Sequence, residues 1–284
     1  MAAEGLAGPA DLGDDEQEAV ELLLHRLADD EFVLAERYTE WQVRSPTLES
    51  DLAVANVAQD ELGHARLWFD LLEDFGYEEQ DLIWERPPEQ WRHSTLAELP
   101  WPDGGWADAV VRGYLYDVAE DLRLGALEDS SYGRIRDRVG KVQGEEDYHL
   151  EHAQNWLERL TEDEDGRGCV QDAVDRQFAH ALTLFEPGDP DLEERIDDLG
   201  LRTTPLSEMG EEWLRRVVPF FESLDVDTPM SGREDVTADQ LPAVVGRDGD
   251  HTDDWFDLYE EFTHTYDQVD VGDPVRIMED PDDE

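Results

Sequence analysis

Two copies of one pattern, Glu-x-x-His preceded about thirty residues earlier by a lone acid, stand out in this sequence. The members of the two copies are Glu31, Glu61 and His64, and then Asp117, Glu146 and His149. The lone acid precedes the paired Glu by 30 residues in the first copy and by 29 in the second. Four acids and two histidines, contributed by four helices, are the ligands of a dinuclear metal site within a four-helix bundle. The repeat therefore predicts that the chain binds a pair of metal ions.

The pattern has to be weighed against composition, because the chain holds 75 Asp and Glu among 284 residues. Four of its eight histidines follow an acid at a distance of three residues, namely His64, His149, His251 and His264. Glu-x-x-His is therefore weak evidence when it is taken alone. The position of each residue on its predicted helix decides between a metal ligand and a surface residue.

In each predicted helix, the acid or histidine interrupts a stripe of apolar residues spaced three and four apart, which marks a buried helix face. The central parts of the four stripes are Leu27, Glu31, Leu34; Val57, Glu61, His64, Trp68; Tyr114, Asp117, Asp121, Leu124; and Val142, Glu146, His149, Ala153. Burying even a neutral polar group without a partner costs about 2–7 kcal/mol. Four facing interruptions therefore imply a shared counter-ion, which a pair of metal ions supplies.

The alternative is that these acids and histidines lie on the solvated faces of acid-rich helices. His251 and His264 fit that alternative, since their neighbours are mixed, and we expect both at the surface. Glu36 and Glu40 are rival lone acids on the first helix, but both fall off its apolar stripe. We therefore prefer Glu31 as the ligand.

A ligand set rich in oxygen, with one imidazole for each metal, suits iron or manganese better than zinc. We expect two iron ions, with manganese as the alternative. Metal-bound imidazoles usually donate their other N–H group to a carboxylate. Asp60 and Glu145 each precede a paired Glu and are candidates for this contact, although both could equally be ordinary surface acids.

The net charge of −53 indicates the conditions in which the protein works. Such a surface repels itself in dilute buffer, whereas molar salt shortens the Debye length to about 3 Å and screens the repulsion. Because Lys141 is the single lysine, we expect a high-salt cytoplasm such as that of a haloarchaeon. The charge disfavours nucleic acid and anionic membranes as partners. A disordered acidic protein is disfavoured too, because 39% of the residues are hydrophobic and nine are Trp.

Cysteine usage and hydropathy narrow the class of protein further. Cys169 is the single cysteine, so the chain has no internal disulfide framework and no cysteine-based zinc or iron–sulfur site. No run of about 18 apolar residues is present, and the N-terminus lacks a basic region followed by an apolar one. We therefore expect a soluble, cytoplasmic protein without a membrane span.

Helical periodicity without strand patterns predicts an all-α, ferritin-like four-helix bundle with one long crossover and additional C-terminal helices. The crossover is the proline-containing stretch 76–105, which is too long for a simple turn. An acidic loop over 162–168 is expected to precede the fifth helix, around 170–185. The expected regions are a mobile tail at 1–16, a bundle at 17–185 built from hairpins 18–75 and 106–161 plus the fifth helix, a helical extension at 186–266 packed on the bundle, and an acidic tail at 267–284.

Three segments of the chain resemble the phenylacetyl-CoA ring epoxidases, a family of di-iron monooxygenases of ferritin-like fold. TLESDLAVANVAQDELGHARLWF, residues 47–69, is similar to the second helix of both large subunits, and its QDELGH core is similar to the catalytic A-type subunit. YHLEHAQNWLERL, residues 148–160, and GDHTDDWFDLYEEFTHTY, residues 249–266, are closer to the C-type subunit. The chain thus looks like a C-type subunit that has competent residues at the six ligand positions of the A type.

The resemblance implies a complex with a catalytic A-type subunit, a small B-type subunit and an iron–sulfur flavoprotein reductase. It also implies 1,2-epoxidation of the CoA-activated aromatic ring in aerobic phenylacetate breakdown. Two other functions stay open at this point. The chain could be a scaffold subunit without a metal, or a free-standing ferritin-like oxidase, peroxidase or radical subunit of a ribonucleotide reductase.

One basic cluster, at the start of the predicted fourth helix, bears on the acyl-CoA substrate. It consists of Arg134, Arg136, Arg138 and Lys141. These cations could contact the phosphates of coenzyme A or an acidic neighbouring subunit. The alternative is that they solubilise a helix face and pair with nearby acids.

Overall fold

The computed structural model describes residues 6–42, 44–101, 105–232, 236 and 240–268. Within these residues the chain is all-α, and its β-type pairing is limited to one isolated bridge between Leu6 and Tyr132. No helix in the described ranges is long and apolar enough to cross a membrane. The prediction of an all-α, ferritin-like helical bundle is confirmed.

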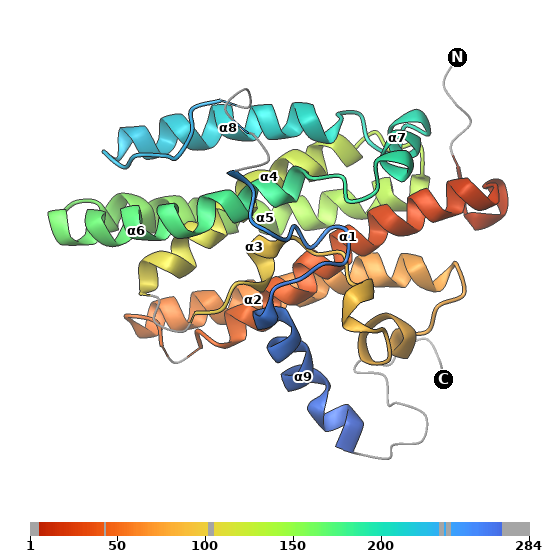
Figure 1. Cartoon of the computed structure of the whole chain (residues 1–284), viewed down its shortest axis with the longest axis horizontal. Coiled ribbons are helices and arrows are strands. Elements are labelled where there is room, and N and C mark those ends of the chain that lie inside the picture. Colours follow the sequence, from red (N-terminus) through yellow and green to blue (C-terminus); the bar gives the residue numbers. More distant parts are fainter. Residues whose placement is uncertain (1–5, 43, 102–104, 233–235, 237–239, 269–284) are drawn as a thin grey trace.

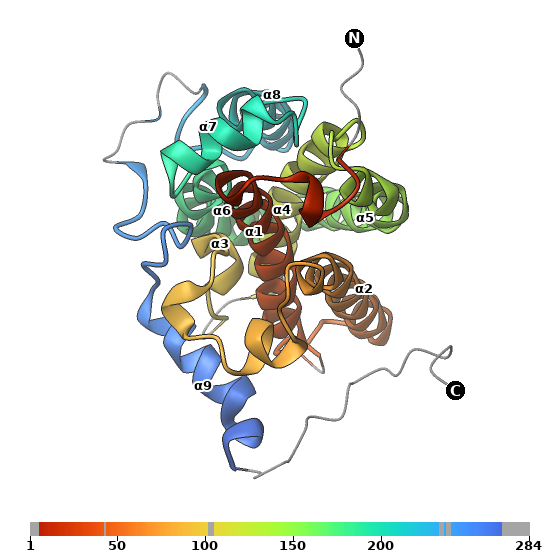
Figure 2. The ribbon, with the colours of Figure 1, turned by 90° about the vertical axis from the view of Figure 1, so that its right-hand side faces the viewer.

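Four long helices form the bundle: α1 (Asp14–Thr39), α2 (Leu48–Glu73), α4 (Trp106–Leu127) and α5 (Gly133–Leu160). Helices α1 and α2 pack as one hairpin, α4 and α5 pack as the other, and α2 also contacts α5. Figure 2 shows the four helices nearly end-on, with α2 beside α1 and α5 beside α4. The four helices therefore enclose a common core, and α4 is buried around most of its circumference.

Local signals fix where the bundle helices begin. The Thr47 hydroxyl accepts a hydrogen bond of 3.1 Å from the Ser50 amide and caps α2. In α1, the Glu16 carboxylate accepts a hydrogen bond of 2.7 Å from the Gly13 amide, and the first turn is acidic, which complements the helix dipole. The observed bounds of α1 and α2 lie within a few residues of the expected hairpin, 18–75.

The crossover between the two hairpins is packed rather than loose. Its described part contains three short helical turns: Gln80–Trp84, Pro88–Gln90 and α3 (Thr95–Glu98). Trp91 and Leu96 are fully buried, and α3 contacts both α1 and α6. The crossover therefore contributes to the core as well as joining the hairpins.

Further elements follow the bundle: α6 (Glu164–Ala181), a turn at Leu182–Phe185, α7 (Pro190–Asp198), α8 (Leu206–Ser223) and α9 (Asp253–Gln268). Helices α6 and α8 pack on α4, and α7 packs on α1. Helix α9 points away from the bundle and contacts α3 (Figure 1). The expectation of an acidic loop over 162–168 is wrong, because α6 already begins at Glu164. The Asp163 carboxylate caps this helix by accepting a 2.8 Å hydrogen bond from the Gly166 amide.

The N-terminal segment differs from the expected tail at 1–16. From Leu6 onward it packs against the bundle: the Leu6 amide donates to the Ser131 carbonyl, and the Gly133 amide donates to the Leu6 carbonyl. Leu12 is buried, and α1 begins at Asp14. Apolar side chains in this short segment explain the difference. The expected acidic tail at 267–284 falls almost wholly outside the described residues, and the division of the helices into regions 17–185 and 186–266 stays a prediction.

Candidate metal centre

Four of the predicted ligands meet inside the bundle. Glu31 comes from α1, Glu61 and His64 come from α2, and Glu146 comes from α5. One ligand atom from each of them lies within 4.8 Å of the ligand atoms of the other three. All four side chains are buried, with at most 3% of the residue exposed. The rival acids Glu36 and Glu40 are not in this group.

The polar atoms at this centre lie close to one another without forming hydrogen bonds. His64 Nδ1 lies 3.2 Å from Glu146 Oε1 and 3.7 Å from Glu31 Oε2. His149 Nδ1 lies 3.3 Å from Glu146 Oε1 and 3.7 Å from Glu61 Oε1. Both carboxylate oxygens of each of the three glutamates, and Nδ1 of each imidazole, are buried without a hydrogen-bond partner. So many unpartnered buried polar atoms require an explanation, and metal ions among them provide one.

The opposite nitrogen of each imidazole contacts a carboxylate across the bundle. His64 Nε2 lies 2.7 Å from Glu145 Oε2, and His149 Nε2 lies 3.3 Å from Asp60 Oδ2. These contacts join α2 to α5 in both directions and turn Nδ1 of each ring toward the centre. An imidazole whose outer N–H group is held by a carboxylate is the arrangement usual for a metal-bound histidine. Asp60 and Glu145 thus contact the two imidazoles, and their role beside a metal stays a prediction.

The electrostatics of the centre favour a positive charge at its middle. Burial raises the pKa of Glu61 well above its usual range, and the neighbouring charges of Glu31 and Glu146 raise it further. Burial alone lowers the pKa of His64, but contacts with Glu146 and Glu31 outweigh it and raise the pKa to about 11. For His149, contact with Glu146 likewise outweighs burial and raises the pKa to about 9. The carboxylates therefore attract a cation to the two Nδ1 atoms.

The predicted ligand on α4, Asp117, lies beside this group rather than among its four closest members. It is buried, and burial together with the charge of Glu146 raises its pKa well above its usual range. Asp117 and His149 line a cavity of about 30 Å³, whose walls also include Tyr38 and Trp106. Roughly 10–15 Å³ suffices for one water molecule, so this cavity admits only very small molecules.

Glu120, one turn after Asp117 on α4, is an acid that the sequence prediction missed. It is fully buried, neither of its oxygens has a hydrogen-bond partner, and it forms an ion pair with Arg123. Burial raises its pKa well above the usual range, and the charge of Glu31 contributes to the shift. The predicted stripe placed Asp121 here instead, but Asp121 lies near the surface and pairs with Arg216. Spacing of three residues from Asp117 is the signal that could have found Glu120.

The basic cluster lies on the first turns of α5, as expected, and part of it is engaged within the chain. Arg134 forms an ion pair with Asp74, and Arg136 donates a 2.7 Å hydrogen bond to the Ser130 carbonyl. Arg138 contacts the Arg134 carbonyl at 3.3 Å, and Lys141 is exposed. Pairing within the chain accounts for the cluster in part, and contact with coenzyme A stays a prediction.

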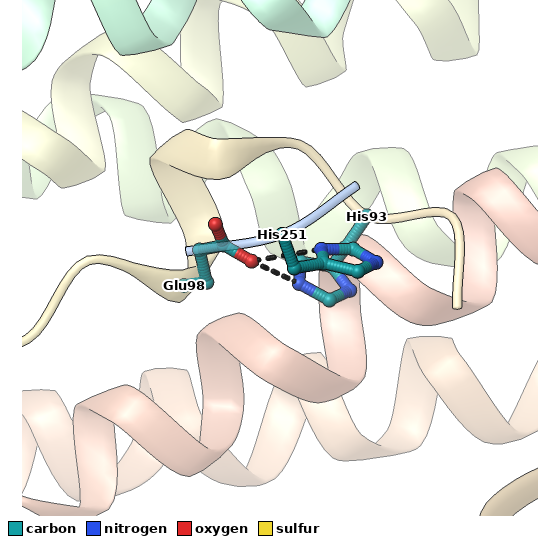
Figure 3. A group of neighbouring side chains, drawn as sticks. All are labelled: His93, Glu98 and His251. Atoms are coloured by element: carbon teal, nitrogen blue, oxygen red, sulfur yellow. Dashed lines mark hydrogen bonds and ion pairs between the residues drawn. The ribbon is translucent and has the colours of Figure 1, made fainter. Parts of the chain in front are cut away.

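The expectation that His251 lies at the surface is wrong. Only 8% of this residue is exposed, and its side chain contacts His93 and Glu98 in a second buried cluster (Figure 3). The loop that carries His251 folds onto the crossover, a long-range contact that helical periodicity does not report. His264, which was expected at the surface as well, is exposed on α9.

Comparison with known proteins agrees with the fold. The family described as phenylacetic acid catabolic protein matches residues 6–272. A curated relative, the C-type subunit of the 1,2-phenylacetyl-CoA epoxidase of Escherichia coli (strain K12), is 28% identical over 231 residues, which cover 80% of this chain and 88% of the relative. Because the family match spans nearly the whole chain, the chain belongs to the phenylacetic acid catabolic protein family.

Proposed function

We propose that the chain is a subunit of a multicomponent phenylacetyl-CoA 1,2-epoxidase of aerobic phenylacetate degradation, and that it holds a carboxylate-bridged di-iron centre. The family match and the relative from Escherichia coli support the first part. The second part rests on one observation: the carboxylate oxygens of Glu31, Glu61 and Glu146 are buried without hydrogen-bond partners around the Nδ1 atoms of His64 and His149.

The residues present fit a pair of iron ions. The three glutamates offer oxygens that can bridge two ions, each imidazole offers one nitrogen, and Asp117 provides a further carboxylate beside them. Two bound irons would supply the electrons that activate dioxygen for insertion into an unreactive ring. The protein's own part is to orient the imidazoles through Asp60 and Glu145 and to exclude water by burial.

We further propose that an A-type catalytic subunit, a small B-type subunit and an iron–sulfur flavoprotein reductase are the partners, with an acyl-CoA as substrate. The cytoplasm of a salt-accumulating cell would suit the charge of −53. The exposed cations of the basic cluster, such as Lys141, would then meet coenzyme A phosphates or an acidic partner surface.

Metal analysis tests the centre directly. The full chain, produced aerobically with iron, is expected to carry about two irons, and the Glu61→Ala and Glu146→Ala variants are expected to lose them. Asp147→Ala is the matched control, since this exposed acid lies next to Glu146 on α5. Iron retained in both ligand variants, or absent from the wild-type chain, would overturn the di-iron proposal.

A second candidate function, a supporting subunit that does not act on the ring itself, is favoured by the size of the cavity. The space beside Asp117 and His149 measures about 30 Å³, far less than an aromatic ring requires. Reconstitution with an A-type subunit separates the two functions. If this chain catalyses ring epoxidation, Glu61→Ala abolishes epoxide formation by the complex. If it only supports the A-type subunit, the complex with Glu61→Ala retains its turnover.

A further inference from the structure

A second group of histidine and carboxylate side chains, independent of the candidate metal centre, joins the crossover to the loop before α9. His93 and Glu98 come from the crossover, and His251 comes from the loop. Figure 3 shows both imidazoles directed at one carboxylate oxygen: Glu98 Oε2 lies 2.8 Å from His93 Nε2 and 2.9 Å from His251 Nδ1. The two rings are stacked, with 4.3 Å between their centroids.

The hydrogen-bond partners of His251 require a positive charge in this group. Its Nε2 lies 3.1 Å from the Trp91 carbonyl oxygen, and its Nδ1 faces the carboxylate of Glu98. Both partners are acceptors, whereas a neutral imidazole carries only one N–H group. A proton or a metal ion therefore has to lie between His251 Nδ1 and Glu98.

The surroundings of the group match those of a bound metal. His251 Nε2 can donate to a backbone carbonyl, which is a frequent orienting contact for a ligating imidazole. The other oxygen of Glu98 accepts a 3.0 Å hydrogen bond from the Thr252 amide, so the carboxylate is oriented as well.

We propose that His93 Nε2, His251 Nδ1 and the carboxylate of Glu98 together bind one divalent ion, with zinc as the best match. Two imidazole nitrogens and one carboxylate oxygen are a three-ligand set that zinc takes in proteins, with the fourth position left for a further ligand. Zinc bonds of about 2.0–2.2 Å place tetrahedral ligand atoms roughly 3.3–3.4 Å apart. Because the ring nitrogens now lie 2.8 and 2.9 Å from Glu98 Oε2, both rings have to move back slightly as the ion enters.

Zinc binding also defines where the protons go. The proton on His251 Nδ1 leaves the protein, because this nitrogen has to present its lone pair to the ion. The proton on His93 Nε2 moves to Nδ1 of the same ring, an atom that has no hydrogen-bond partner. One proton is therefore released for each ion bound, and the ion then ties the crossover to the loop before α9.

The experiment uses the full chain with Glu61→Ala and Glu146→Ala, so that zinc at the candidate di-iron centre does not contribute. After incubation with zinc chloride and gel filtration, this chain is expected to retain about one zinc and to release about one proton per ion. Adding His251→Asn or Glu98→Gln is expected to weaken zinc binding at least tenfold. Adding His264→Asn, which removes an exposed histidine on α9, is expected to leave it unchanged.

Three results would overturn the proposal: no zinc on the doubly substituted chain, zinc that survives both His251→Asn and Glu98→Gln, or zinc uptake without proton release. Cobalt(II) provides a measurement that needs no substitution at His93, Glu98 or His251. A tetrahedral cobalt site with nitrogen ligands gives intense visible absorption. If cobalt(II) on the doubly substituted chain shows no such absorption, the assignment is overturned. The di-iron proposal is judged separately, from the metal that the wild-type chain holds and the doubly substituted chain has lost.

Discussion

Two buried groups of this chain combine histidine with carboxylate, and the spacing of their atoms differs. At the candidate metal centre, Nδ1 of His64 and of His149 lies 3.2–3.9 Å from oxygens of the three glutamates, and these atoms have no hydrogen-bond partners. In the group of His93, Glu98 and His251, the corresponding distances are 2.8 and 2.9 Å. The nitrogen and oxygen atoms of the first group form no hydrogen bonds with one another, whereas those of the second group do.

The difference in spacing indicates how much each group contributes to the stability of the metal-free chain. Three glutamates facing one another repel, and in the metal-free chain this cost is offset by protons on His64 and His149, whose places metal cations would take. Glu98 instead has three donors, which come from two imidazoles and the Thr252 amide. The second group therefore stabilises the fold with a proton alone, and a metal ion has to compete with that proton.

The largest expected effect concerns Glu98. Replacing Glu98 by Ala leaves His93, His251 and the Thr252 amide without their shared acceptor, so the free energy of unfolding should fall by about 3–5 kcal/mol. Denaturant titration in the presence of a chelator measures the loss, with Glu260→Ala on the exposed face of α9 as the control. If Glu98→Ala and Glu61→Ala cost the same under these conditions, the contrast between the two groups is wrong.

Removing iron should lower the stability of the wild-type chain through the candidate metal centre, and not through the group of His93, Glu98 and His251. At a free-iron concentration roughly a thousand times the Kd, bound iron stabilises the wild-type chain by about 4 kcal/mol. Chelation should remove this stabilisation from the wild type and change Glu61→Ala very little, as measured by denaturant titration with and without iron. An equal response of both chains to chelation would contradict the assignment of Glu61 as a ligand.

The pH dependence of stability is a third way to compare the groups. The pKa of His93 is lowered to about 4 in the folded chain by burial and by the charge of His251. The unfolded chain binds this proton near pH 6.5, so folding loses stability as the pH falls from about 6.5 to 4. The loss is on the order of 2–3 kcal/mol. His93→Asn should flatten this part of the stability curve, and an unchanged slope between pH 6.5 and 4 would refute the expectation.

At the candidate metal centre, stability should fall as the pH rises, which is the opposite of the dependence expected for His93. His64 and His149 have folded pKa values raised to about 11 and about 9, because contacts with carboxylates outweigh burial. In the metal-free chain their contribution is fully present below pH 6.5 and is lost as the pH rises through 9 and 11. The change that His93→Asn makes to the acid limb therefore reports on His93, and the change that substitution of His64 or His149 makes to the alkaline limb reports on the candidate metal centre.

Helical periodicity explains why the burial of most candidate ligands could be predicted from sequence. Glu31, Glu61 and His64 interrupt regular apolar stripes, and the structure buries all three. The stripe on α4 is less regular, so Asp121 was placed on the buried face where Glu120 lies. A helix that is buried around most of its circumference, as α4 is, gives a poor signal of which face meets the core.

The second group could not be predicted by the same reasoning. His251 lies in a loop, and its burial depends on contacts with Trp91 and Glu98, which are more than 150 residues away in the sequence. Loop residues have no fixed periodicity, so their neighbours follow from the tertiary fold rather than from spacing. His251 was expected at the surface because its sequence neighbours are mixed, a criterion that applies to helices and not to loops.

The smallest expected effect concerns the outer partner of His64. Glu145 Oε2 lies 2.7 Å from His64 Nε2, and the Glu145 side chain is 40% exposed. Glu145→Gln keeps an oxygen that can accept this N–H group but removes the negative charge that makes the imidazole a better ligand. Iron affinity should therefore fall roughly tenfold, at the lower end of the range for such partners. Calorimetric or competition titration of the anaerobic chain with iron(II) measures this change.

Glu151→Gln is the matched control for Glu145→Gln, because it removes an exposed charge from the same helix. Both substitutions change the net charge equally, so a long-range electrostatic effect on iron binding would appear in both. A tenfold loss confined to Glu145→Gln would show that the charge acts through the His64 ring. Equal losses would mean that Glu145 contributes only to the general field, and the contact between α2 and α5 would then orient the imidazole without strengthening it.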